Sequence, residues 1–97
     1  MKFEIAPKST EIQANWDEAN IYCAELKIDG KTGWRLPTKE ELNEIYESEN
    51  DFVGTCYWSS TVCNGSYTWS QNMNNGYQFN RLKYYGGTYV RAIRSTV

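Results

Sequence analysis

"GWRLPTKEEL", at residues 33–42, contains the start of a helix and the turn that leads into it. Thr38 stands at the N-cap position, and Glu41 follows three residues later, which is the spacing of a capping box. Pro37 keeps the preceding residue in an extended conformation. These residues predict a helix over residues 38–48. Its predicted buried face comprises Leu42, Ile45 and Tyr46.

A second helix is predicted upstream, in "NWDEANIYCAEL" at residues 15–26. Asn15 is a typical N-cap residue, Glu18 completes another capping box, and acidic residues occupy the first turn. Gly30 marks the end of the run. Four residues share one stripe at helical spacing and are expected to pack inward: Trp16, Ala19, Cys23 and Leu26.

Downstream of residue 56 the hydrophobic period changes from helical to two, which is typical of strands. The expected strands are "YWSST", "YTWSQNM", "YQFNRLK" and "TYVRAIRS", at residues 57–61, 67–73, 77–83 and 88–95. "FEIAP", at residues 3–7, adds another at the start. The order predicts a single α+β domain over residues 1–97, with two helices packed on a twisted antiparallel sheet.

The Asn-Asn-Gly sequence at residues 74–76 predicts a hairpin, and its register can be chosen by side-chain polarity. A two-residue loop would pair Asn74 with Tyr77 and would leave both faces mixed. A three-residue loop pairs Met73 with Tyr77 and separates the faces, so we predict that loop. The inward face would hold Trp69, Met73, Tyr77 and Phe79. The outward face would hold Thr68, Ser70, Asn72, Gln78 and Asn80, with Leu82 as an exception.

The charge pattern and the absence of histidine narrow the function classes. Without histidine the chain lacks the commonest general base and every His-containing metal site. Residues 1–52 carry all 12 acids and a net charge of −6, whereas residues 53–97 carry four cations and no acid. Four scattered cations are too few for a nucleic-acid footprint. The acid-free half makes Ca²⁺ ligation improbable. We therefore predict no cofactor, no metal and no nucleic-acid partner.

The three cysteines, Cys23, Cys56 and Cys63, form no metal-binding pair. If residues 56–63 form one strand, its ends lie about 20 Å apart, which excludes a bridge between its two cysteines. Two alternatives remain: all three thiols are reduced and buried, or Cys23 pairs with one of the others. No segment approaches the roughly 20 apolar residues of a membrane helix. The N-terminal residues lack a signal-peptide core.

Five segments follow one another over residues 16–94: "WDEANIYCAEL", "GWRLPTKEEL", "YWSST", "WSQNMNNG" and "YVRAIR". In this order the chain resembles the Lcl C-terminal-like domain family of bacterial and phage proteins, which implies a C-type-lectin-like fold. Formylglycine-generating enzymes and the variable proteins diversified by retroelements share that fold. The resemblance does not extend to the reactive cysteine pair of those enzymes. Residues 64–87 resemble the diversified segment of the variable proteins, because Asn and Tyr are frequent in both.

Several charged or nucleophilic residues have a structural interpretation that we favour over a functional one. Arg35 could bind an anion near a helix start, but a hydrogen-bonded brace is predicted. We interpret Arg91 and Arg94 in the same way. Ser59 and Ser60 have no base to activate them, so we predict no enzymatic activity. A solvated acidic helix face is expected to hold Glu40, Glu41, Glu44 and Glu47.

The acid-free segment at residues 64–87 has the composition of a binding surface, because Tyr provides rigid contact area and Ser, Gly and Asn provide adaptable hydrogen bonds. We predict a module that binds a protein or glycan on a cell surface, in an adhesin, a phage receptor-binding protein or a retroelement-diversified protein. An assembly domain of a larger extracellular or virion protein, or a homo-oligomer, is the alternative. The predicted ligand-binding residues are Tyr67, Thr68, Ser70, Asn72, Asn74, Gln78, Asn80, Tyr84 and Tyr85.

Overall fold

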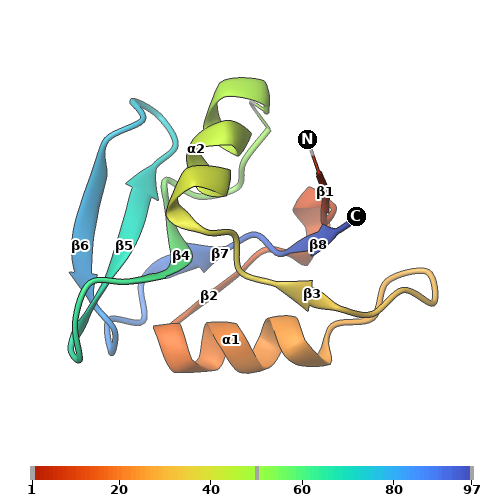
Figure 1. Ribbon diagram of the computed structural model, residues 1–97, viewed down its shortest axis with the longest axis horizontal. Helices are drawn as coiled ribbons and strands as arrows, with labels where there is room; N and C mark the ends of the chain where they lie inside the picture. The colour runs from red at the N-terminus through yellow and green to blue at the C-terminus, as the bar shows by residue number, and fades with distance from the viewer. Residues whose placement is uncertain (1, 50, 97) are drawn as a thin grey trace.

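The computed structural model describes residues 2–49 and 51–96, and it confirms an α+β fold with two helices. The strands form a three-stranded sheet, ordered β1-β8-β3, and a five-stranded sheet, ordered β2-β7-β4-β5-β6. Neighbouring strands are antiparallel except β4 and β7. In Figure 1 these two strands lie between α2 and α1. The bounds are β1 Phe3–Ile5, η1 Lys8–Thr10, β2 Ile12–Ala14, α1 Trp16–Glu25, β3 Trp34–Arg35, α2 Lys39–Ser48, β4 Cys56–Val62, β5 Tyr67–Asn72, β6 Gln78–Leu82, β7 Thr88–Val90 and β8 Ile93–Ser95.

The last predicted strand, residues 88–95, is divided between the two sheets. Its first part, β7, belongs to the five-stranded sheet, and its second part, β8, belongs to the three-stranded sheet. The chain crosses between them at Arg91 and Ala92, both buried. Strand β8 pairs with β1, and Phe3 lies opposite Ser95. The two ends of the described chain therefore lie side by side (Figure 1).

Both predicted helices begin with the predicted capping box. At the start of α1, Asn15 Oδ1 accepts the Glu18 N–H at 2.9 Å, and Glu18 Oε1 accepts the Asn15 N–H at 3.3 Å. At the start of α2, Thr38 Oγ1 accepts the Glu41 N–H at 3.1 Å, and Glu41 Oε1 accepts the Thr38 N–H at 2.9 Å. These bonds satisfy main-chain donors that the helices leave free, so both helix starts are set locally.

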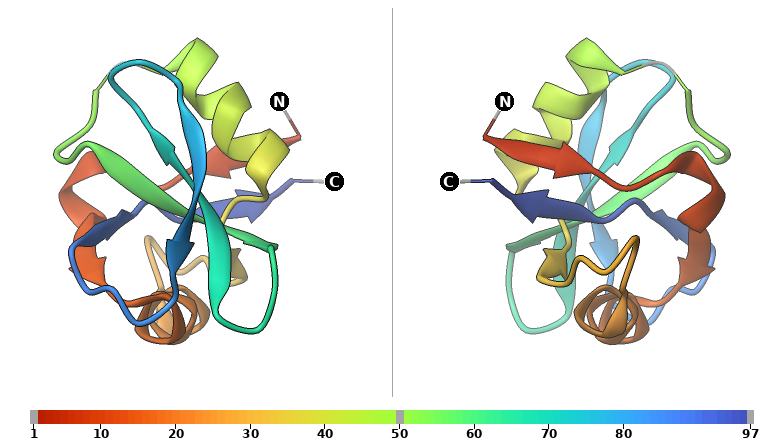
Figure 2. Two further views of the ribbon diagram at one scale, coloured as in Figure 1. Left: turned by 90° about the vertical axis from the view of Figure 1, so that its left-hand side faces the viewer. Right: turned by 90° about the vertical axis from the view of Figure 1, so that its right-hand side faces the viewer.

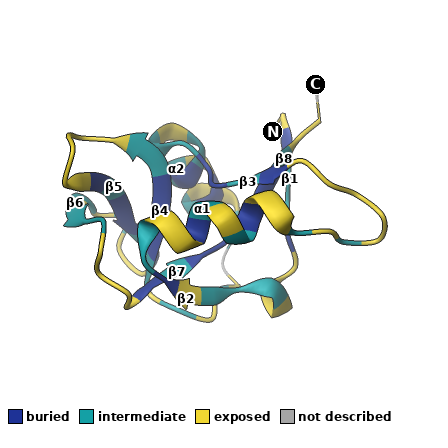
Figure 3. Cartoon of the chain, turned by 90° about the horizontal axis from the view of Figure 1, so that it is seen from below, coloured by how far each residue is buried: buried dark blue, intermediate teal, exposed yellow. Residues whose placement is uncertain are grey.

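Strand β4 runs through the core with both faces covered. Its neighbouring residues Tyr57 and Trp58 are both 0% exposed, and they point to opposite faces because side chains alternate along a strand. Trp58 packs in a cluster with Ala19 and Cys23 of α1, whereas Tyr57 packs in a second cluster with Leu42 of α2. The helices thus cover opposite sides of this strand. Figure 3 shows α1 in the foreground, where buried and exposed residues alternate along it.

Arg35 braces the start of α2, as predicted. Its Nη1 and Nη2 donate to the two carboxylate oxygens of Glu41 at 2.7 Å and 2.9 Å. This two-point hydrogen bond is the main reason why the pKa of Glu41 falls to about 2. Arg94 is also a brace: it donates to Glu4 at 3.0 Å and to the Thr32 carbonyl at 2.7 Å. The geometry confirms the structural interpretation of both arginines.

Arg91 is the third brace, and it lies inside the protein. Its Nη1 donates to Glu11 Oε2 at 2.7 Å and to the Asp51 carbonyl at 3.0 Å, while its Nε donates to the Ala6 carbonyl at 2.7 Å. The other Glu11 oxygen accepts the Tyr57 hydroxyl. Burial and then this hydrogen bond raise the pKa of Tyr57. The network joins the N-terminal segment, the loop before β4 and the crossing between the sheets.

The predicted register of the β5–β6 hairpin is wrong. Ser70 lies opposite Phe79, and the Asn72 N–H donates to the Tyr77 carbonyl at 2.8 Å. The loop therefore has four residues, 73–76, instead of three. A shift of one residue reverses which side chains of the two strands share a face. Tyr77, predicted to point inward, is 67% exposed, and Phe79 is only half-buried.

The buried position of Met73 explains the longer loop. Its main-chain N–H donates to the Thr55 carbonyl at 2.7 Å, and its side chain packs in the cluster that contains Leu42. At the other end of the loop, Gly76 has a φ of +81°, and a Cβ there would lie 2.7 Å from the ring of Tyr46. The loop is thus fixed by its contacts with α2 and with the segment before β4, which side-chain alternation within the hairpin does not reveal.

All three cysteines are free, so the alternative with a disulfide is not formed. Cys23 is buried, and burial raises the pKa of its thiol to about 12. Cys56 is half-buried and Cys63 is exposed, so the prediction that all three are buried is wrong. Among residues 2–49 and 51–96, no helix has the length and apolar character needed to cross a membrane.

Candidate ligand-binding surface

Strand β6 is an edge strand of the five-stranded sheet. It pairs with β5 on one side, and no described strand pairs with its other side. Figure 2, left, shows β6 in front of the other strands, on the side of the molecule that the hairpin forms. A hollow of about 400 Å³ opens along it. The residues that line it are Tyr67, Phe79, Asn80, Arg81, Leu82 and Tyr85.

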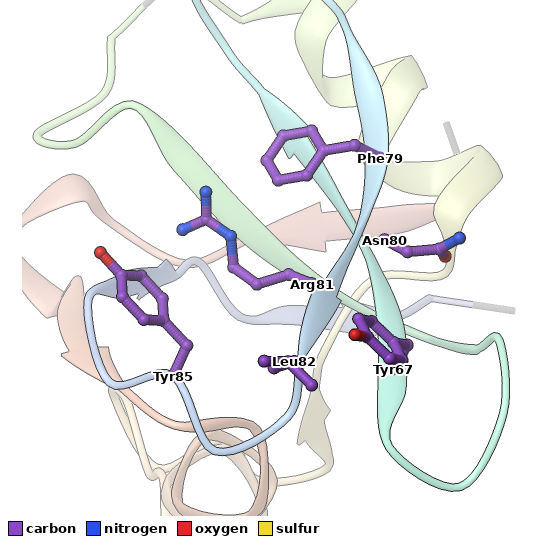
Figure 4. A pocket seen from close by; sticks show the side chains of 6 residues that line it. All are labelled: Tyr67, Phe79, Asn80, Arg81, Leu82 and Tyr85. Carbon is purple, nitrogen blue, oxygen red and sulfur yellow. The ribbon is translucent and has the colours of Figure 1, made fainter.

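The lining side chains come from both sides of β6. Phe79, Arg81 and Tyr85 lie on one side of the strand in Figure 4, whereas Asn80 and Tyr67 lie on the other. Alternation along β6 explains the division among Phe79, Asn80 and Arg81, whereas Tyr67 comes from β5 and Tyr85 follows β6. Three aromatic rings, one carboxamide and one cation therefore lie around β6.

Arg81 is held in a fixed position at this surface. Its Nη1 donates to Thr88 Oγ1 at 3.0 Å. Its guanidinium carbon lies 4.9 Å from the ring centre of Phe79 and 4.8 Å from that of Tyr85. No carboxylate in the described parts of the chain forms an ion pair with it. Arg81 is therefore a pre-positioned cation whose remaining N–H donors are available to an anionic group.

Helix α2 covers one end of one face of the hairpin. Gln71 is buried and donates to Asn43 Oδ1 at 2.9 Å, and Gln78 donates to the Lys39 carbonyl at 2.9 Å. The ammonium of Lys39 lies 3.6 Å from the ring centre of Trp69. These contacts satisfy the polar side chains that the corrected register places beneath the helix. This end of the face cannot contact a ligand, because α2 already occupies it. Tyr67, Asn80 and Leu82 lie on the same face beyond these contacts and line the hollow.

The structure brings together three of the predicted site residues. Tyr67, Asn80 and Tyr85 line the hollow. Two others, Asn74 and Tyr84, are exposed but lie outside it, and Tyr84 is 76% exposed. The predicted surface is thus divided, and only its part around β6 is concave.

The remaining four predicted residues do not face solvent as expected. Thr68 and Ser70 are buried, so placing them on an outward face was wrong. Thr68 Oγ1 donates to the Thr61 carbonyl at 3.1 Å, whereas Ser70 Oγ has no hydrogen-bond partner among the described residues. Gln78 and Asn72 are half-buried, and the Gln78 amide is occupied by α2. Thr68 and Ser70 lie on the face of β5 opposite Gln71, and all three are buried, so β5 is covered on both faces.

Three asparagines of the segment at residues 64–87 have a turn-building role. Asn64 Oδ1 accepts the Ser66 and Tyr67 N–H groups at 2.9 Å and 3.0 Å. Asn72 Oδ1 accepts the Asn74 N–H at 2.8 Å, and Asn75 Oδ1 accepts the Tyr77 N–H at 2.9 Å. Such side-chain acceptors are the usual reason for Asn in turns. The asparagine content of the segment is therefore explained in part by local structure.

Sequence reasoning missed Phe79, Arg81 and Leu82 as lining residues. Phe79 was expected inside, and Leu82 was the unexplained apolar residue on a polar face. That exception was the available signal, because in the observed register Leu82 lies opposite Tyr67 and shares its face. Arg81 had a weaker signal: it is one of four cations in the half of the chain without acids. Its lack of a carboxylate partner can be seen only in the folded chain.

A family model described as the Lcl C-terminal domain matches residues 4–94, which is almost the whole chain. No curated protein matches the sequence significantly. In the described parts of the chain, no three His, Cys, Asp or Glu side chains are grouped so that they could hold a metal ion.

Proposed function

The chain belongs to the Lcl C-terminal domain family, and from the surface around β6 we propose that it acts as a ligand-binding module. Its ligand would be a protein or a glycan presented on a cell surface. The parent protein would be an extracellular protein, an adhesin or a phage receptor-binding protein. Binding would use the hollow at β6 and would require no metal and no cofactor.

The observation that carries the proposal is the composition and fixed geometry of this hollow. Ligand sites in proteins are concave, largely apolar and provided with a few well-placed polar groups. The hollow combines the rings of Tyr67, Phe79 and Tyr85 with the polar ends of Asn80 and Arg81. Tyr and Asn are also typical of evolved binding surfaces, because they combine contact area with adaptable hydrogen bonds.

We propose binding rather than catalysis because two candidate nucleophiles, Ser59 and Cys23, are occupied or deactivated and the chain has no histidine. Ser59 Oγ is buried and donates to the Trp69 carbonyl at 2.7 Å. Burial raises the pKa of the Cys23 thiol to about 12, so it stays protonated at neutral pH. The chain has no histidine to act as a base for either residue.

The test is a pair of tyrosine variants measured against a glycan array and a panel of cell-surface proteins. Tyr85→Ala removes a ring from the hollow and should weaken binding to any authentic partner at least tenfold, as central aromatic residues do in interfaces. Tyr84→Ala is the matched control, because Tyr84 is adjacent and exposed but lies outside the hollow. Equal binding by the unaltered chain and the folded Tyr85→Ala variant would contradict the proposed site.

A finer proposal is that retroelement-directed mutation diversifies this surface. Asn80, Asn74, Tyr84 and Tyr85 support it, because they are exposed and because, among the described residues, neither asparagine side chain accepts a turn hydrogen bond. The test is the neighbouring DNA: a near-duplicate of about the last 40 codons that differs at adenines, next to a reverse transcriptase gene. A neighbourhood without either feature would overturn this finer proposal and leave the binding proposal intact.

The alternative function, an assembly domain, is favoured by one feature of the hairpin. The ring of Tyr77 is exposed and stacks on Phe79, with the ring centres 5.8 Å apart. Exposed stacked rings can be covered by a neighbouring subunit. Multi-angle light scattering separates the alternatives: a stable oligomer that Tyr77→Ala dissociates supports assembly, whereas a monomer at high concentration supports the binding module.

A further inference from the structure

We propose that β6 accepts an extended acidic peptide as an added strand of the five-stranded sheet. The inference rests on the proposed binding function and names the class of ligand. Strand addition to an exposed edge is a recurring mode of peptide recognition, in which the main chain supplies affinity and the alternating side chains supply specificity. Both parts of such a site are present along β6.

The main chain of β6 offers unpaired groups at alternate residues. The Asn72 N–H donates to the Tyr77 carbonyl at 2.8 Å, and the Lys83 N–H donates to the Ser66 carbonyl at 2.9 Å. These two bonds set the phase of the β5–β6 ladder, in which every second residue bonds to the partner strand. The N–H and C=O groups of Gln78 and Asn80 therefore point away from β5, toward the open edge.

The side chains next to this edge specify what an added strand would carry. A peptide residue opposite Arg81 would lie on the same face as Arg81, and its neighbour two positions away would lie opposite Phe79. Arg81 has no ion-pair partner among the described residues, so an acidic side chain fits opposite it. The ring of Phe79 favours an apolar side chain. The predicted pattern is therefore one acidic and one apolar residue, two positions apart.

Charge favours such a peptide over a second copy of this chain. Residues 53–97 contain no acid, so the β6 strand of another copy would bring only further cations, Arg81 and Lys83, to this edge. Like charges placed opposite each other on paired strands are destabilising. The edge is therefore unsuited to pairing with itself and suited to a strand that carries carboxylates.

The first test uses a defined peptide and measures affinity by fluorescence anisotropy. The probe has seven residues: threonine at the odd places, valine at the second and sixth, and aspartate at the fourth. We expect saturable binding, and we expect at least tenfold weaker binding when asparagine replaces aspartate. Arg81→Glu should lose the original peptide and bind a version with lysine at the fourth place. Equal affinity for the aspartate, asparagine and lysine peptides would overturn the assignment of Arg81.

The second test separates strand addition from binding through side chains alone. N-methylation of the threonine at the fifth place removes an N–H that would bond to Asn80 in an antiparallel addition, whereas N-methylation of the valine at the sixth place removes one that points away. Strand addition predicts that methylation at the fifth place abolishes binding and that methylation at the sixth place does not. Equal effects of both would overturn it.

A matched pair of protein variants distinguishes this inference from the proposed function. Asn80→Pro removes an outward main-chain donor, at an edge position where proline is tolerated, while Asn80→Ala keeps that donor. Strand addition predicts that only the proline variant loses the peptide. If Tyr85→Ala weakens binding to a cell-surface partner and the folded Asn80→Pro variant binds both partner and peptide normally, the binding function stands and strand addition is wrong.

Discussion

The centre of the protein and the surface at β6 each contain an arginine, and the two side chains have opposite surroundings. Arg91 is 5% exposed, pairs with the buried carboxylate of Glu11 and also donates to two main-chain carbonyls. Arg81 lies at the surface between two aromatic rings and donates to a threonine hydroxyl. The guanidinium of Arg91 is neutralised and holds the fold together, whereas that of Arg81 is positioned without a carboxylate from any described residue.

This difference follows from the uneven distribution of acids and cations along the chain. All the acids lie in residues 1–52, so the cations of the second half can be neutralised only by contacts across the fold. Arg91 and Arg94 obtain such contacts, with Glu11 and Glu4. Arg81 and Lys83 form no ion pair with the described residues. Arg81 belongs to β6, at the far edge of the sheet (Figure 1), where the hollow lies.

The largest expected effect is the loss of the buried pair. Arg91→Met should lower the free energy of unfolding by about 3–5 kcal/mol, because Glu11 would stay buried without its cation. Urea denaturation measures the change. Arg81→Met is the control and should lower it by less than about 1 kcal/mol, as for other exposed cation–π contacts.

If Arg91→Met does not fold, the double variant Arg91→Met/Glu11→Gln tests whether the buried, unpaired charge of Glu11 is the cause. It should recover part of the lost stability, since no unpaired charge remains. If Arg91→Met and Arg81→Met lowered the free energy of unfolding equally, the two arginines would not differ in their contribution to stability.

The hairpin register predicts the next largest effect. Met73→Ala should lower the free energy of unfolding by about 2–3 kcal/mol, because it leaves a cavity beneath α2. Tyr77→Ala should change it by less than about 0.5 kcal/mol, because Tyr77 is mostly exposed. The three-residue loop would place both side chains inside. Similar decreases in the free energy of unfolding for the two variants, measured by thermal or urea denaturation, would therefore support that register.

The pair at the start of α2 predicts a dependence of stability on pH. The hydrogen bond from Arg35 lowers the pKa of Glu41 from 4.5 to about 2. Its stabilising contribution is therefore complete above about pH 4.5 and is lost as the pH falls toward 2. Because Arg35 is partly exposed, the expected size is only about 1 kcal/mol.

Denaturation at a series of pH values tests this expectation. Glu41→Gln should remove about 1 kcal/mol of stability at pH 7 and show a smaller further loss between pH 4.5 and 2. Glu44→Gln is the control, because Glu44 lies on the exposed side of the same helix. An unchanged pH profile in Glu41→Gln would mean that the pair contributes nothing measurable.

The smallest expected effect comes from two buried hydroxyls of β5. Thr68→Val should lower the free energy of unfolding by about 1 kcal/mol, because the Thr61 carbonyl loses its donor. Ser70→Ala should leave it unchanged or raise it slightly, because Ser70 Oγ has no partner among the described residues. A loss of more than about 1 kcal/mol in Ser70→Ala would show that this hydroxyl is satisfied after all.

Sequence reasoning succeeded where the cause is local and failed where it is not. The capping residues Asn15 and Thr38 act within four residues of themselves, so both helix starts were predicted correctly. The hairpin loop was predicted one residue too short, because Met73 is held by Thr55 and α2, which lie far away in the sequence. Thr68 and Ser70 were misplaced because β5 is buried on both faces, which the alternation of polar and apolar residues does not predict.

The sequence by itself determined the helix starts, the α+β class and the separation of acids from the second half of the chain, because capping, periodicity and composition act through neighbouring residues. Only the tertiary structure decided how far each face of the hairpin is covered and that Arg81 has no carboxylate partner among the described residues. Both depend on α2 covering one end of the hairpin and on β6 becoming the edge of the sheet. The physical reason is that burial and charge pairing are set by contacts between segments distant in the chain.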